Sequence, residues 1–566
     1  MNIVGLHNDL DAGACLVQDG RVLCAINEER LSRVKLHSGV PRQSLAWVLD
    51  FAGLRLEDVD WFVYSWYGKQ NDYGNYSRKL VTRVVEALHN DPGCGPILEQ
   101  RVKVEFDRDQ TTREKFEAWL HELGIPQTKV AYYDHHLTHA WSAFATSPFD
   151  EALVFTFDGR GDLKSATVSS VSTSKGIKEH DYLLSFDSLG FLYGQMTHYL
   201  GFDHNRHEGK VTGLAAMGDP AKTMGLMEQL ITWESGTIRA NIGLYKPFYT
   251  NLGERLMELL KSHTREDLAA AVQQHCETLV LKYMDHWIQE LKPSQPVNMC
   301  ASGGLFANVK LNQRIADRWG GDRFFVFPHM GDGGLMIGGA LFHHYRLTGR
   351  AKCIFDGVYL GPAYDETDVL GALRAAGSDV VYDRPHDLVQ SVVNDLTANR
   401  VVGYFDGRME FGPRALGARS VLFHARDRRA NDWLNKRMRR SEFMPFAPVT
   451  PIELAAECYK NWTAQDRNSF FMTQTYECLD DFQRRHPAVV HVDGTARPQI
   501  VRRDMNPRYY DVVRRYCDAT GDRALINTSF NVHEEPIVCS PQDAISSLVR
   551  DCVDIVYLGP FRVMKK

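Results

Sequence analysis

The sequence predicts an α/β fold on three observations. Apolar, strand-like runs end in Asp-Gly or Gly-Gly turns, helical stretches separate these runs, and 44% hydrophobic with 24% charged residues is an ordinary globular balance. In α/β proteins the turns that follow such strands gather at one edge of a sheet, where ligands bind. The chain has 566 residues, enough for roughly three to five domain-sized units.

The predicted elements follow in order along the chain. A hairpin is expected where Asp19-Gly20 joins two apolar runs, because this dipeptide favours a tight turn. One later strand ends at Asp158-Gly159 and another ends at Ser302-Gly303-Gly304, while helical patterns cover 253–292 and 335–345. The expected strands are 3–6, 14–17, 22–26, 152–157 and 297–301.

Composition disfavours several classes of protein. A net charge of −6 argues against a nucleic-acid binder. No run of about 18 apolar residues is present, so no transmembrane helix and no membrane partner are expected. The N-terminus has no basic lead and is not read as a signal peptide. Eleven cysteines are scattered singly without a CxxC, which favours a reducing cytoplasm over a disulfide framework.

A change of texture divides the chain into two expected domains. The helical pattern stops near residue 346, and the Tyr-Leu-Gly-Pro run at 359–362 is typical of a boundary. We therefore expect one domain over 1–350 and a second over 365–566. No repeat with a fixed short period is found in either.

Two histidines form the first candidate site. His135 and His139 are spaced i, i+4, so on a helix both imidazoles project from one face, as in other two-histidine metal sites. An isolated HxxxH is more often a plain histidine cluster. Asp158 and Asp332 favour the metal interpretation, because both lie in glycine-flanked turns where side chains converge.

Glycine-rich turns form the second candidate site. Three of them occur in the first domain, at 158–162, 302–304 and 331–334. Glycine lets backbone N–H groups approach phosphates closely, so three such turns suggest a nucleotide cleft, whereas one would be an ordinary tight turn. Neither a Walker motif nor a GxGxxG fingerprint is present.

The second domain carries an arginine-rich segment. Arg414 and Arg419 lie in the run 412–419, in a Gly-Pro…Gly context that suits a buried loop. Guanidinium groups match phosphate and carboxylate oxygens, so the segment reads either as a small-anion pocket or as a charged surface paired with nearby aspartates. Its other cationic residues are Lys436, Arg437, Arg439, Arg440, Arg497, Arg502 and Arg503. No GxSxG elbow or reactive-cysteine signature is present, which disfavours an acyl-enzyme.

Seven collinear motifs together point to a family. They are Glu28-Glu29-Arg30 with Arg33 and Lys35, the His135-His136-x-x-His139-Ala140 segment, Glu208-Gly209-Lys210 with 213–215, Gly303-Gly304 with Asn308, 409–417, 445–448 and 527–531. Over nearly its whole length the chain resembles the O-carbamoyltransferases of the nodulation, cephamycin and tobramycin type.

The resemblance implies a fold and an activity. Residues 1–350 would form an actin/sugar-kinase-like domain that binds ATP and metal, and residues 365–566 would form a YrdC-like domain. The second domain would make carbamoyladenylate from carbamoyl phosphate and ATP. The first would then transfer the carbamoyl group to a hydroxyl of a small acceptor such as a sugar, an aminoglycoside, a nucleoside or another natural product. The family also suggests a homodimer.

The resemblance further assigns roles to individual residues. A divalent metal, iron in many members, with Mg²⁺ accompanying ATP, would be held by His135, His139, Asp158 and Asp332. Asp11, Glu208 and Lys210 would serve catalysis. The ligand-binding residues implied for ATP and carbamoyl phosphate are Gly159, Asp162, Gly303, Gly304, Asn308, Lys35, Arg414, Arg440, Arg497 and His533.

The chain departs from the family pattern at four positions. Leu10 stands where many members have a histidine, with His7 or Asp9 as the nearest substitutes, and Met438, Met444 and His533 stand where some members have cations. These changes leave open a different acyl donor or a preformed adenylate on the same fold. The expected fold of the first domain leaves open an enzyme of the tRNA threonylcarbamoylation type, against which the net charge of −6 argues. The acceptor pocket is expected in 65–130 and 200–260, with Trp66, Tyr73, Tyr76 and His204 as candidate ring contacts.

Overall fold

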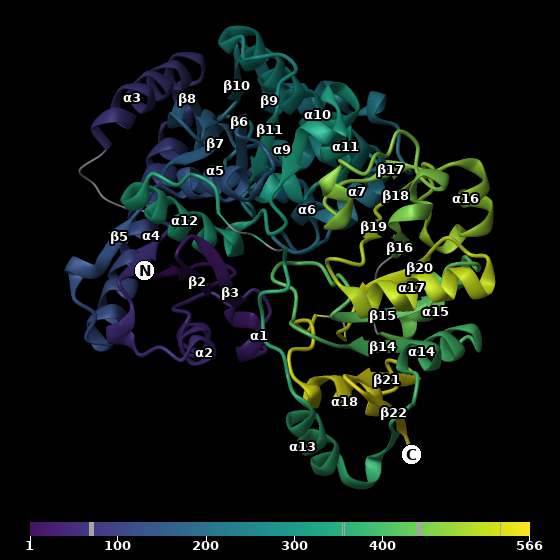
Figure 1. Ribbon diagram of the computed structural model, residues 1–566. Helices are drawn as coiled ribbons and strands as arrows, with labels where there is room; N and C mark the ends of the chain where they lie inside the picture. The colour runs from purple at the N-terminus through teal and green to yellow at the C-terminus, as the bar shows by residue number, and fades with distance from the viewer. Residues whose placement is uncertain (67–72, 354, 356, 439–443, 533) are drawn as a thin grey trace. The chain divides into compact units, whose positions relative to one another are not determined.

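The computed structural model describes residues 1–566 except 67–72, 354, 356, 439–443 and 533 (Figure 1). The chain forms two compact units. Unit 1 comprises Met1–Val22, Ser38–Pro41 and Leu49–Ile354, and unit 2 comprises Leu23–His37, Arg42–Val48 and Phe355–Lys566. Both are mixed α/β structures, as the sequence predicts.

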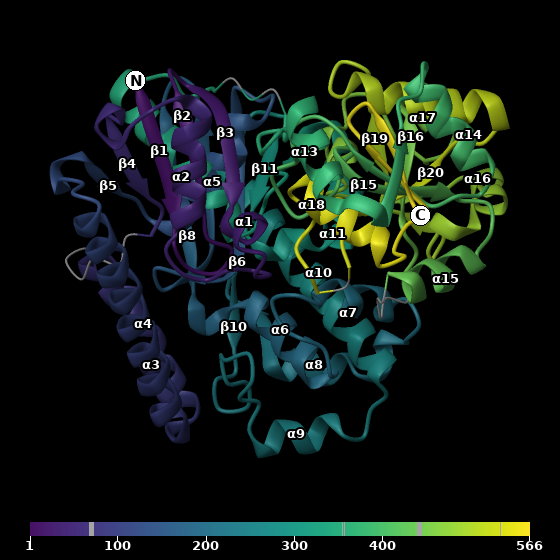
Figure 2. The same cartoon turned by 90° about the horizontal axis from the view of Figure 1, so that it is seen from below.

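The first sheet of unit 1 has the strand order β3-β2-β1-β4-β5 and is drawn with its first three strands in purple in Figure 2. β1 pairs antiparallel with β2 on one side and parallel with β4 on the other, and β4 pairs parallel with β5. The strands are β1 (Asn2–His7), β2 (Gly13–Gln18), β3 (Arg21–Asn27), β4 (Trp61–Tyr64) and β5 (Val130–Tyr132).

The second sheet repeats this arrangement. Its order is β12-β11-β6-β7-β8, with β6 antiparallel to β7 and parallel to β11. In each sheet, the first strand pairs with a hairpin on one side and with parallel strands on the other. This arrangement occurs twice, which confirms the expected actin/sugar-kinase-like class. The strands are β6 (Glu151–Gly161), β7 (Lys164–Ser172), β8 (Gly176–Leu184), β11 (Met299–Ser302) and β12 (Phe324–Val326).

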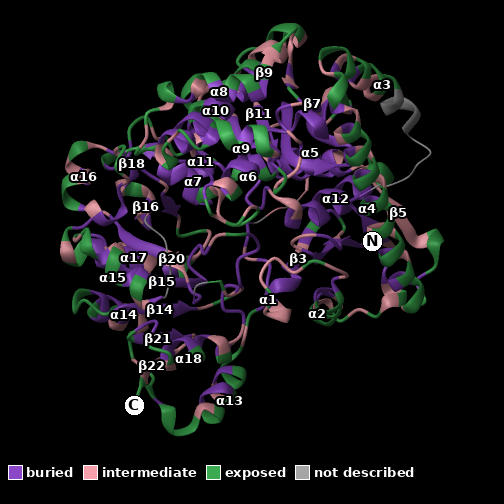
Figure 3. Cartoon of the chain, turned by 180° about the vertical axis from the view of Figure 1, so that it is seen from behind, coloured by how far each residue is buried: buried purple, intermediate pink, exposed green. Residues whose placement is uncertain are grey.

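Two buried helices, α5 (His135–Thr146) and α12 (Leu335–Thr348), pack tightly against each other. The approach requires glycine, because a Cβ on Gly338 would lie 1.9 Å from the carbonyl oxygen of Thr138. Figure 3 shows α5 almost wholly buried, whereas α3 carries exposed residues. The other elements of unit 1 are α3 (Tyr73–Asn90), α4 (Gly95–Glu122), α6 (Leu189–Tyr199), α7 (Glu208–Ala215), α8 (Met224–Leu230), β9 (Ile231–Glu234), β10 (Thr237–Ala240), α9 (Glu254–Leu260), α10 (Arg265–Leu291) and α11 (Val309–Trp319).

Unit 2 is built on an eight-stranded mixed sheet with the order β13-β22-β21-β14-β15-β20-β16-β19. The strands are β13 (Val380–Asp383), β14 (Val402–Phe405), β15 (Arg419–His424), β16 (Ala447–Pro451), β19 (Gln499–Val501), β20 (Leu525–Ser529), β21 (Ile555–Leu558) and β22 (Phe561–Lys565). A two-stranded sheet adds β17 (Tyr476–Glu477) and β18 (Thr495–Ala496). The helices are α13 (Glu366–Ala376), α14 (Leu388–Thr397), α15 (Arg429–Arg437), α16 (Asp480–Arg485), α17 (Pro507–Thr520) and α18 (Pro541–Val549).

A segment from the beginning of the chain belongs to unit 2. It carries α1 (Glu28–Ser32) and the first part of α2 (Arg42–Ala52). The Arg30 guanidinium donates to the carbonyl oxygen of Gly412 at 3.0 Å, and that of Arg33 donates to the carbonyl oxygen of Ile537 at 2.8 Å. Two residues of the Glu-Glu-Arg motif region thus tie this segment to backbone far along the chain.

No helix within the described residues is long and apolar enough to cross a bilayer. All eleven cysteines are free thiols, and ten of them are buried.

Candidate functional site

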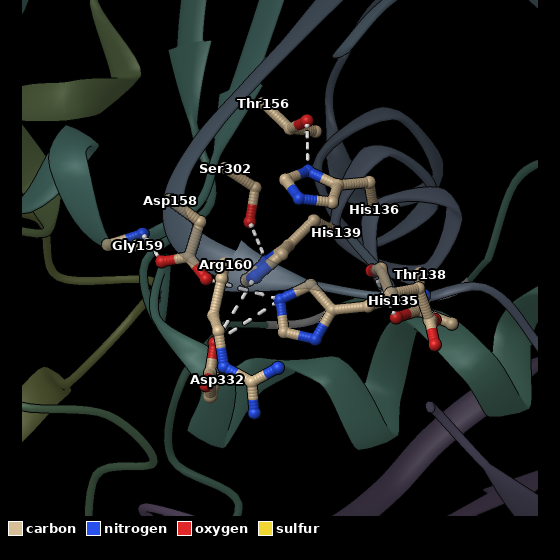
Figure 4. Close-up of polar contacts among 12 residues, drawn as sticks. His135, His136, Thr138, His139, Thr156, Asp158, Gly159, Arg160, Ser302 and Asp332 are labelled. Atoms are coloured by element: carbon tan, nitrogen blue, oxygen red, sulfur yellow. Dashed lines mark hydrogen bonds and ion pairs between the residues drawn. The ribbon is translucent and has the colours of Figure 1, made fainter. Parts of the chain in front are cut away.

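The four residues expected to bind metal come together in unit 1 (Figure 4). α5 supplies both histidines, β6 supplies Asp158, and the turn before α12 supplies Asp332. The His135 Nε2 atom lies 3.2 Å from Asp158 Oδ2, and the His139 Nε2 atom lies 3.4 Å from Asp332 Oδ1. One ligand atom from each residue lies within 4.8 Å of all the others.

The glycine-rich turn 158–162 positions His135 directly. A Cβ on Gly161 would lie 2.2 Å from the imidazole ring, so glycine is needed for the ring to rest on β6. Asp162 Oδ2 accepts a hydrogen bond from the backbone N–H of His135 at 2.8 Å, and Asp158 Oδ1 accepts one from Gly304 N–H at 2.8 Å. In this structure, Asp162 and Gly304, two residues expected to contact nucleotide, therefore form hydrogen bonds with the histidine–aspartate cluster.

Three buried atoms of the cluster have no hydrogen-bond partner among the described residues, namely His135 Nδ1, His139 Nε2 and Asp332 Oδ1. The Ser302 hydroxyl donates to the carbonyl oxygen of Met330 at 3.2 Å and lies 3.0 Å from His139 Nδ1, which must then be the protonated ring nitrogen. His139 Nε2 consequently presents a lone pair. That atom and Asp332 Oδ1 are buried with no hydrogen-bond partner among the described residues. A cation between them would meet both, and two imidazoles with two carboxylates suit a first-row divalent metal.

Mutual charge shifts the pKa values within the cluster. Burial and the neighbouring Asp158 raise the pKa of Asp332 to about 7. Burial opposes protonation of His135, but Asp332 and Asp158 outweigh it and raise the pKa of His135 to about 9. Burial and the nearby His135 lower the pKa of His139 to about 3. His135 and Asp332 therefore retain their protons to a higher pH than usual, and a bound cation would displace these protons.

The expected catalytic residues lie on two segments of unit 1, namely the turn after β1 and the helix α7. Asp11 follows β1 with a positive φ of 62° and has Oδ2 at 3.5 Å from Nε2 of His329. Glu208 begins α7, where burial raises the pKa of its carboxyl. Lys210 is buried, with its Nζ 5.9 Å from the centre of the Phe202 ring. Our sequence reasoning missed His329; its place three residues before Asp332 was the available signal.

Two of the expected nucleotide contacts have other neighbours in the structure. Asn308 caps α11 by accepting from Leu311 N–H at 3.1 Å, and its amide donates to Gln273 Oε1 at 2.8 Å. Gly159 leaves room for Tyr249, whose hydroxyl would lie 2.3 Å from a Cβ there. Burial raises the pKa of Tyr249, a residue that no sequence pattern marked. Gly303 needs its φ of 109°, since a Cβ would meet the Phe157 carbonyl oxygen at 2.2 Å.

In unit 2, the loop 409–417 is held by buried hydrogen bonds. Glu410 Oε1 accepts from the backbone N–H groups of Leu416 at 2.7 Å and Ala418 at 2.6 Å. Gln499 donates to the carbonyl oxygen of Leu416 at 2.7 Å, and Asn527 of β20 donates to that of Ala415 at 3.1 Å. A residue of the Asn-Thr-Ser-Phe-Asn motif therefore hydrogen-bonds to the arginine-containing loop 409–417.

This loop presents Arg414, which has no carboxylate partner among the described residues. The side chain is half-buried, its Nε is a buried donor without an acceptor, and burial lowers the pKa of its guanidinium. An uncompensated guanidinium of this kind suits an anion. Arg437, by contrast, pairs with Asp554 at 2.7 Å and Arg503 pairs with Asp511 at 3.1 Å, as expected for a charged surface.

Of the four other residues predicted for the donor site, the structure describes two. Lys35 and Arg497 are half-buried residues of unit 2. Arg440 and His533, with the neighbouring Arg439, lie outside the described residues. Met438 is fully buried, so this substitution places a core side chain where some relatives have a cation.

Of the candidate ring contacts, Trp66 lies beside the cluster, with its ring centre 4.7 Å from that of His135. His204 stacks on Tyr249 at 4.8 Å. Tyr73 and Tyr76 fall in α3.

Comparison with known proteins gives the family. Residues 2–341 match the family model described as carbamoyltransferase N-terminus, and residues 393–565 match carbamoyltransferase C-terminus. An uncharacterised protein of Synechocystis is 32% identical, covering 98% of this chain and 95% of its own. Nodulation protein NolNO of Sinorhizobium fredii is 30% identical, covering 98% and 79%.

Solved structures resemble the chain only weakly. The activator of 2-hydroxyisocaproyl-CoA dehydratase from Clostridium difficile shares 14% identity at a TM-score of 0.33, covering 61% of this chain and 95% of that protein. HypF of T. kodakarensis shares 10% identity at 0.37, covering 62% and 48%. The family models carry the identification: the chain belongs to the carbamoyltransferase family and is an enzyme of this class.

Proposed function

We propose that this enzyme is an ATP-dependent O-carbamoyltransferase. Unit 2 would join carbamoyl phosphate and ATP into carbamoyladenylate, and unit 1 would transfer the carbamoyl group to a hydroxyl of a small, sugar-like acceptor. The observation that carries the proposal is the histidine–aspartate cluster of unit 1, in which His139 Nε2 and Asp332 Oδ1 are buried and find no hydrogen-bond partner in the described part of the chain.

The loop of unit 2 supports the donor half of the reaction. Arg414 offers a guanidinium fork without a competing carboxylate, and such forks bind phosphate oxygens in a bidentate manner. Glu410 keeps the loop closed by accepting three backbone N–H groups, which leaves the arginine free to meet an anion. Lys35 and Arg497 would add charge in the same unit.

The cluster of unit 1 supports the transfer half. A divalent cation bound there would neutralise negative charge on a phosphate leaving group. His139 and Asp332 would hold that cation through their bare atoms, and Ser302 would fix the imidazole tautomer by accepting the Nδ1 hydrogen. Asp158, held by Gly304 N–H, would complete the ligand set.

Pyrophosphate release tests the proposal. Metal-loaded full-length protein receives ATP with and without carbamoyl phosphate, in the absence of any acceptor. We expect release that depends on carbamoyl phosphate. Arg414→Met should reduce it by about 10²-fold, as for loss of a charged group that binds a reacting phosphate. Arg502→Met is the matched control, because Arg502 already pairs with Asp504 at the surface.

Protein that is folded and binds ATP but releases no pyrophosphate with carbamoyl phosphate would contradict the proposed donor. That result would favour a different acyl donor, in keeping with the buried Met438. If Arg414→Met and Arg502→Met lost pyrophosphate release equally, Arg414 and its loop would have no special role in binding the donor.

A further inference from the structure

One face of α4 carries a buried row of charged residues. Arg101, Glu105 and Asp109 are spaced four residues apart, so they lie along one side of the helix. They are 3%, 0% and 3% exposed, on a helix that is otherwise rich in exposed charge. Buried charges are costly unless they are paired or serve a ligand.

Arg160 of β6 joins this row. Its Nη1 donates to Glu105 Oε2 at 2.6 Å and to Asp109 Oδ1 at 2.8 Å. Arg101 donates to Glu105 Oε1 at 2.9 Å and to the carbonyl oxygen of Pro247 at 3.1 Å, so Glu105 uses both of its oxygens. The row and the strand are therefore connected by a continuous buried network.

Two atoms of the network are left without a partner. Asp109 Oδ2 and Arg160 Nη2 are both buried and make no hydrogen bond among the described residues. Leaving such atoms unsatisfied costs about 1–3 kcal/mol each, and folded proteins rarely do so. The bare acceptor and the bare donor belong to two residues already bonded to each other. A hydroxyl group, which donates one hydrogen bond and accepts another, can satisfy both.

This pair lies beside the histidine–aspartate cluster. Arg160 is two residues beyond Asp158, in the same irregular stretch of β6 between Phe157 and Gly161. Figure 4 shows the Arg160 side chain extending among the cluster residues. The Trp66 ring connects the two groups, with its centre 5.5 Å from the Arg160 guanidinium and 4.7 Å from the His135 ring.

We propose that Asp109 and Arg160 bind the reacting hydroxyl of the acceptor, with Asp109 as its proton acceptor and Trp66 as one wall of the subsite. This inference rests on the proposed carbamoyl transfer and adds residues from α4, a helix that no motif marks. The acceptor oxygen forms a bond to the carbamoyl carbon. The bond from that carbon to the adenylate phosphate oxygen breaks, and its electron pair leaves with AMP. The hydroxyl proton passes to Asp109 Oδ2.

The surroundings of Asp109 suit this task. Burial, together with the charges of Glu105 and Asp162, raises the pKa of its carboxyl to about 7 against the opposing effect of Arg160. The charge of Asp109 in turn helps to raise the pKa of the buried Tyr64, whose hydroxyl donates to Asn8 Oδ1 at 2.7 Å. A base acts best with a pKa near the working pH. Ionised Asp109 would accept the proton, so transfer should slow as the pH falls below about 7.

The two unsatisfied atoms also limit the acceptor. Arg160 Nη2 needs a hydrogen-bond acceptor, which an ammonium group cannot supply because it only donates. The acceptor class that fits is an uncharged polyol or sugar rather than one with an amine next to the reacting oxygen.

The experiment separates activation from transfer. Metal-loaded full-length protein receives ATP and ¹⁴C-labelled carbamoyl phosphate. Glycerol serves as a neutral probe acceptor, 3-amino-1,2-propanediol as its cationic counterpart, and water as the smallest hydroxyl. Pyrophosphate reports adenylate formation, whereas labelled carbamate or AMP reports transfer.

The variants are Asp109→Asn and Arg160→Lys. The control is Asp187→Asn, which alters an equally buried aspartate whose two oxygens both bond Arg83.

We expect Asp109→Asn to keep pyrophosphate release and metal content but to slow transfer by about 10²-fold or more, with the low-pH fall of the wild-type profile gone. Arg160→Lys should raise the KM for glycerol, and the cationic probe should be the poorer acceptor for the wild type. Asp187→Asn should lower the melting temperature without changing the ratio of transfer to activation.

Three results would overturn the inference. They are wild-type transfer rates in folded Asp109→Asn, an unchanged KM in Arg160→Lys, and wild-type protein that releases pyrophosphate yet carbamoylates neither glycerol nor water. Absence of pyrophosphate release from the wild type would instead contradict the proposed function.

Discussion

At the scale of single residues, the histidine–aspartate cluster depends on a glycine as well as on its four polar side chains. Gly161 has no side chain, and this absence is what lets the His135 ring rest on β6. The His135–His139 pair was predictable because i, i+4 spacing is a local signal, and the two aspartates because they end strand-like runs. The ring contact at Gly161 was not, because it joins α5 to a strand folded back against it.

We predict that Gly161→Ala weakens divalent metal binding by about 10–100-fold, as for loss of a group that orients a ligand. The added Cβ would lie 2.2 Å from the His135 ring and must displace it. Titration with Co²⁺, followed by its visible absorption, measures the affinity. Gly225→Ala in α8 is the control, because nothing lies within 4 Å of a Cβ there. Equal affinities in the two variants would show that the close contact is unimportant.

At the scale of elements, the loop 409–417 and the end of α16 show two ways in which local geometry is fixed. The loop turns through Gly412 and Gly417, with φ of 125° and 109°, and Glu410 fills its centre as an acceptor. Sequence patterns identified the loop as special, since Gly-Pro-Arg and Asn-Thr-Ser motifs are unusual. They could not pair the two motifs, because the hydrogen bonds of Asn527 and Gln499 span long stretches of chain.

For the loop, Gly417→Ala should abolish pyrophosphate release while leaving the protein folded. Its Cβ would meet the Tyr509 ring at 2.2 Å, so the loop that presents Arg414 must move. Gly407→Ala separates this clash from backbone strain. Gly407 also has a positive φ, 65°, but nothing lies within 4 Å of a Cβ at that position. The idea fails if both variants lose the same activity.

For the end of α16, stability should depend on the protonation of His486. Burial lowers the pKa of this histidine to about 4, despite the opposing charge of Asp522. Its ring stacks on Phe482 and Nε2 accepts the Arg523 N–H at 3.1 Å, which requires the neutral form. The stabilisation is fully present above about pH 6.5 and is lost as the pH falls towards 4.

Urea midpoints measured from pH 7 to pH 4 check this prediction. The wild type should lose stability over that interval, and His486→Gln should start lower and fall less steeply. His121→Gln, an exposed change on α4, should reproduce the wild-type slope. Parallel curves for all three proteins would rule His486 out as the cause.

At the scale of the whole molecule, the α/β class followed from strand and turn signals, but the duplicated sheet of unit 1 did not. The two copies share strand order without sharing sequence: β1 reads Asn-Ile-Val-Gly-Leu-His, and the corresponding part of β6 reads Ala-Leu-Val-Phe-Thr-Phe. A search for short periods cannot detect a repeat that begins again only at Glu151. The assignment of Leu23–His37 to unit 2 was equally invisible, because it rests on contacts such as Arg30 with Gly412.

A chain ended at residue 354 tests that assignment. Ala25 N–H would lose its acceptor, the Leu360 carbonyl oxygen at 3.2 Å, and Arg33 would lose that of Ile537. Hydrogen exchange should therefore become fast in α1 while the amides of β1 stay protected by β2 and β4. Unchanged protection of α1 in the shortened chain would show that the segment does not need unit 2.

The same segment sets an order of events during synthesis. Residues 23–37 are made long before their partners, because Arg30 binds the carbonyl group of Gly412 and Arg33 binds those of Pro536 and Ile537. The sheet of unit 2 can assemble only after β22 has been made, and until then α1 lacks its hydrogen-bond partners in that unit. Chimaeras between relatives should therefore exchange residues 23–48 together with 355–566, which keeps the parts of unit 2 from one protein. Exchange of 355–566 alone would combine one protein's carboxyl-terminal residues with another protein's α1.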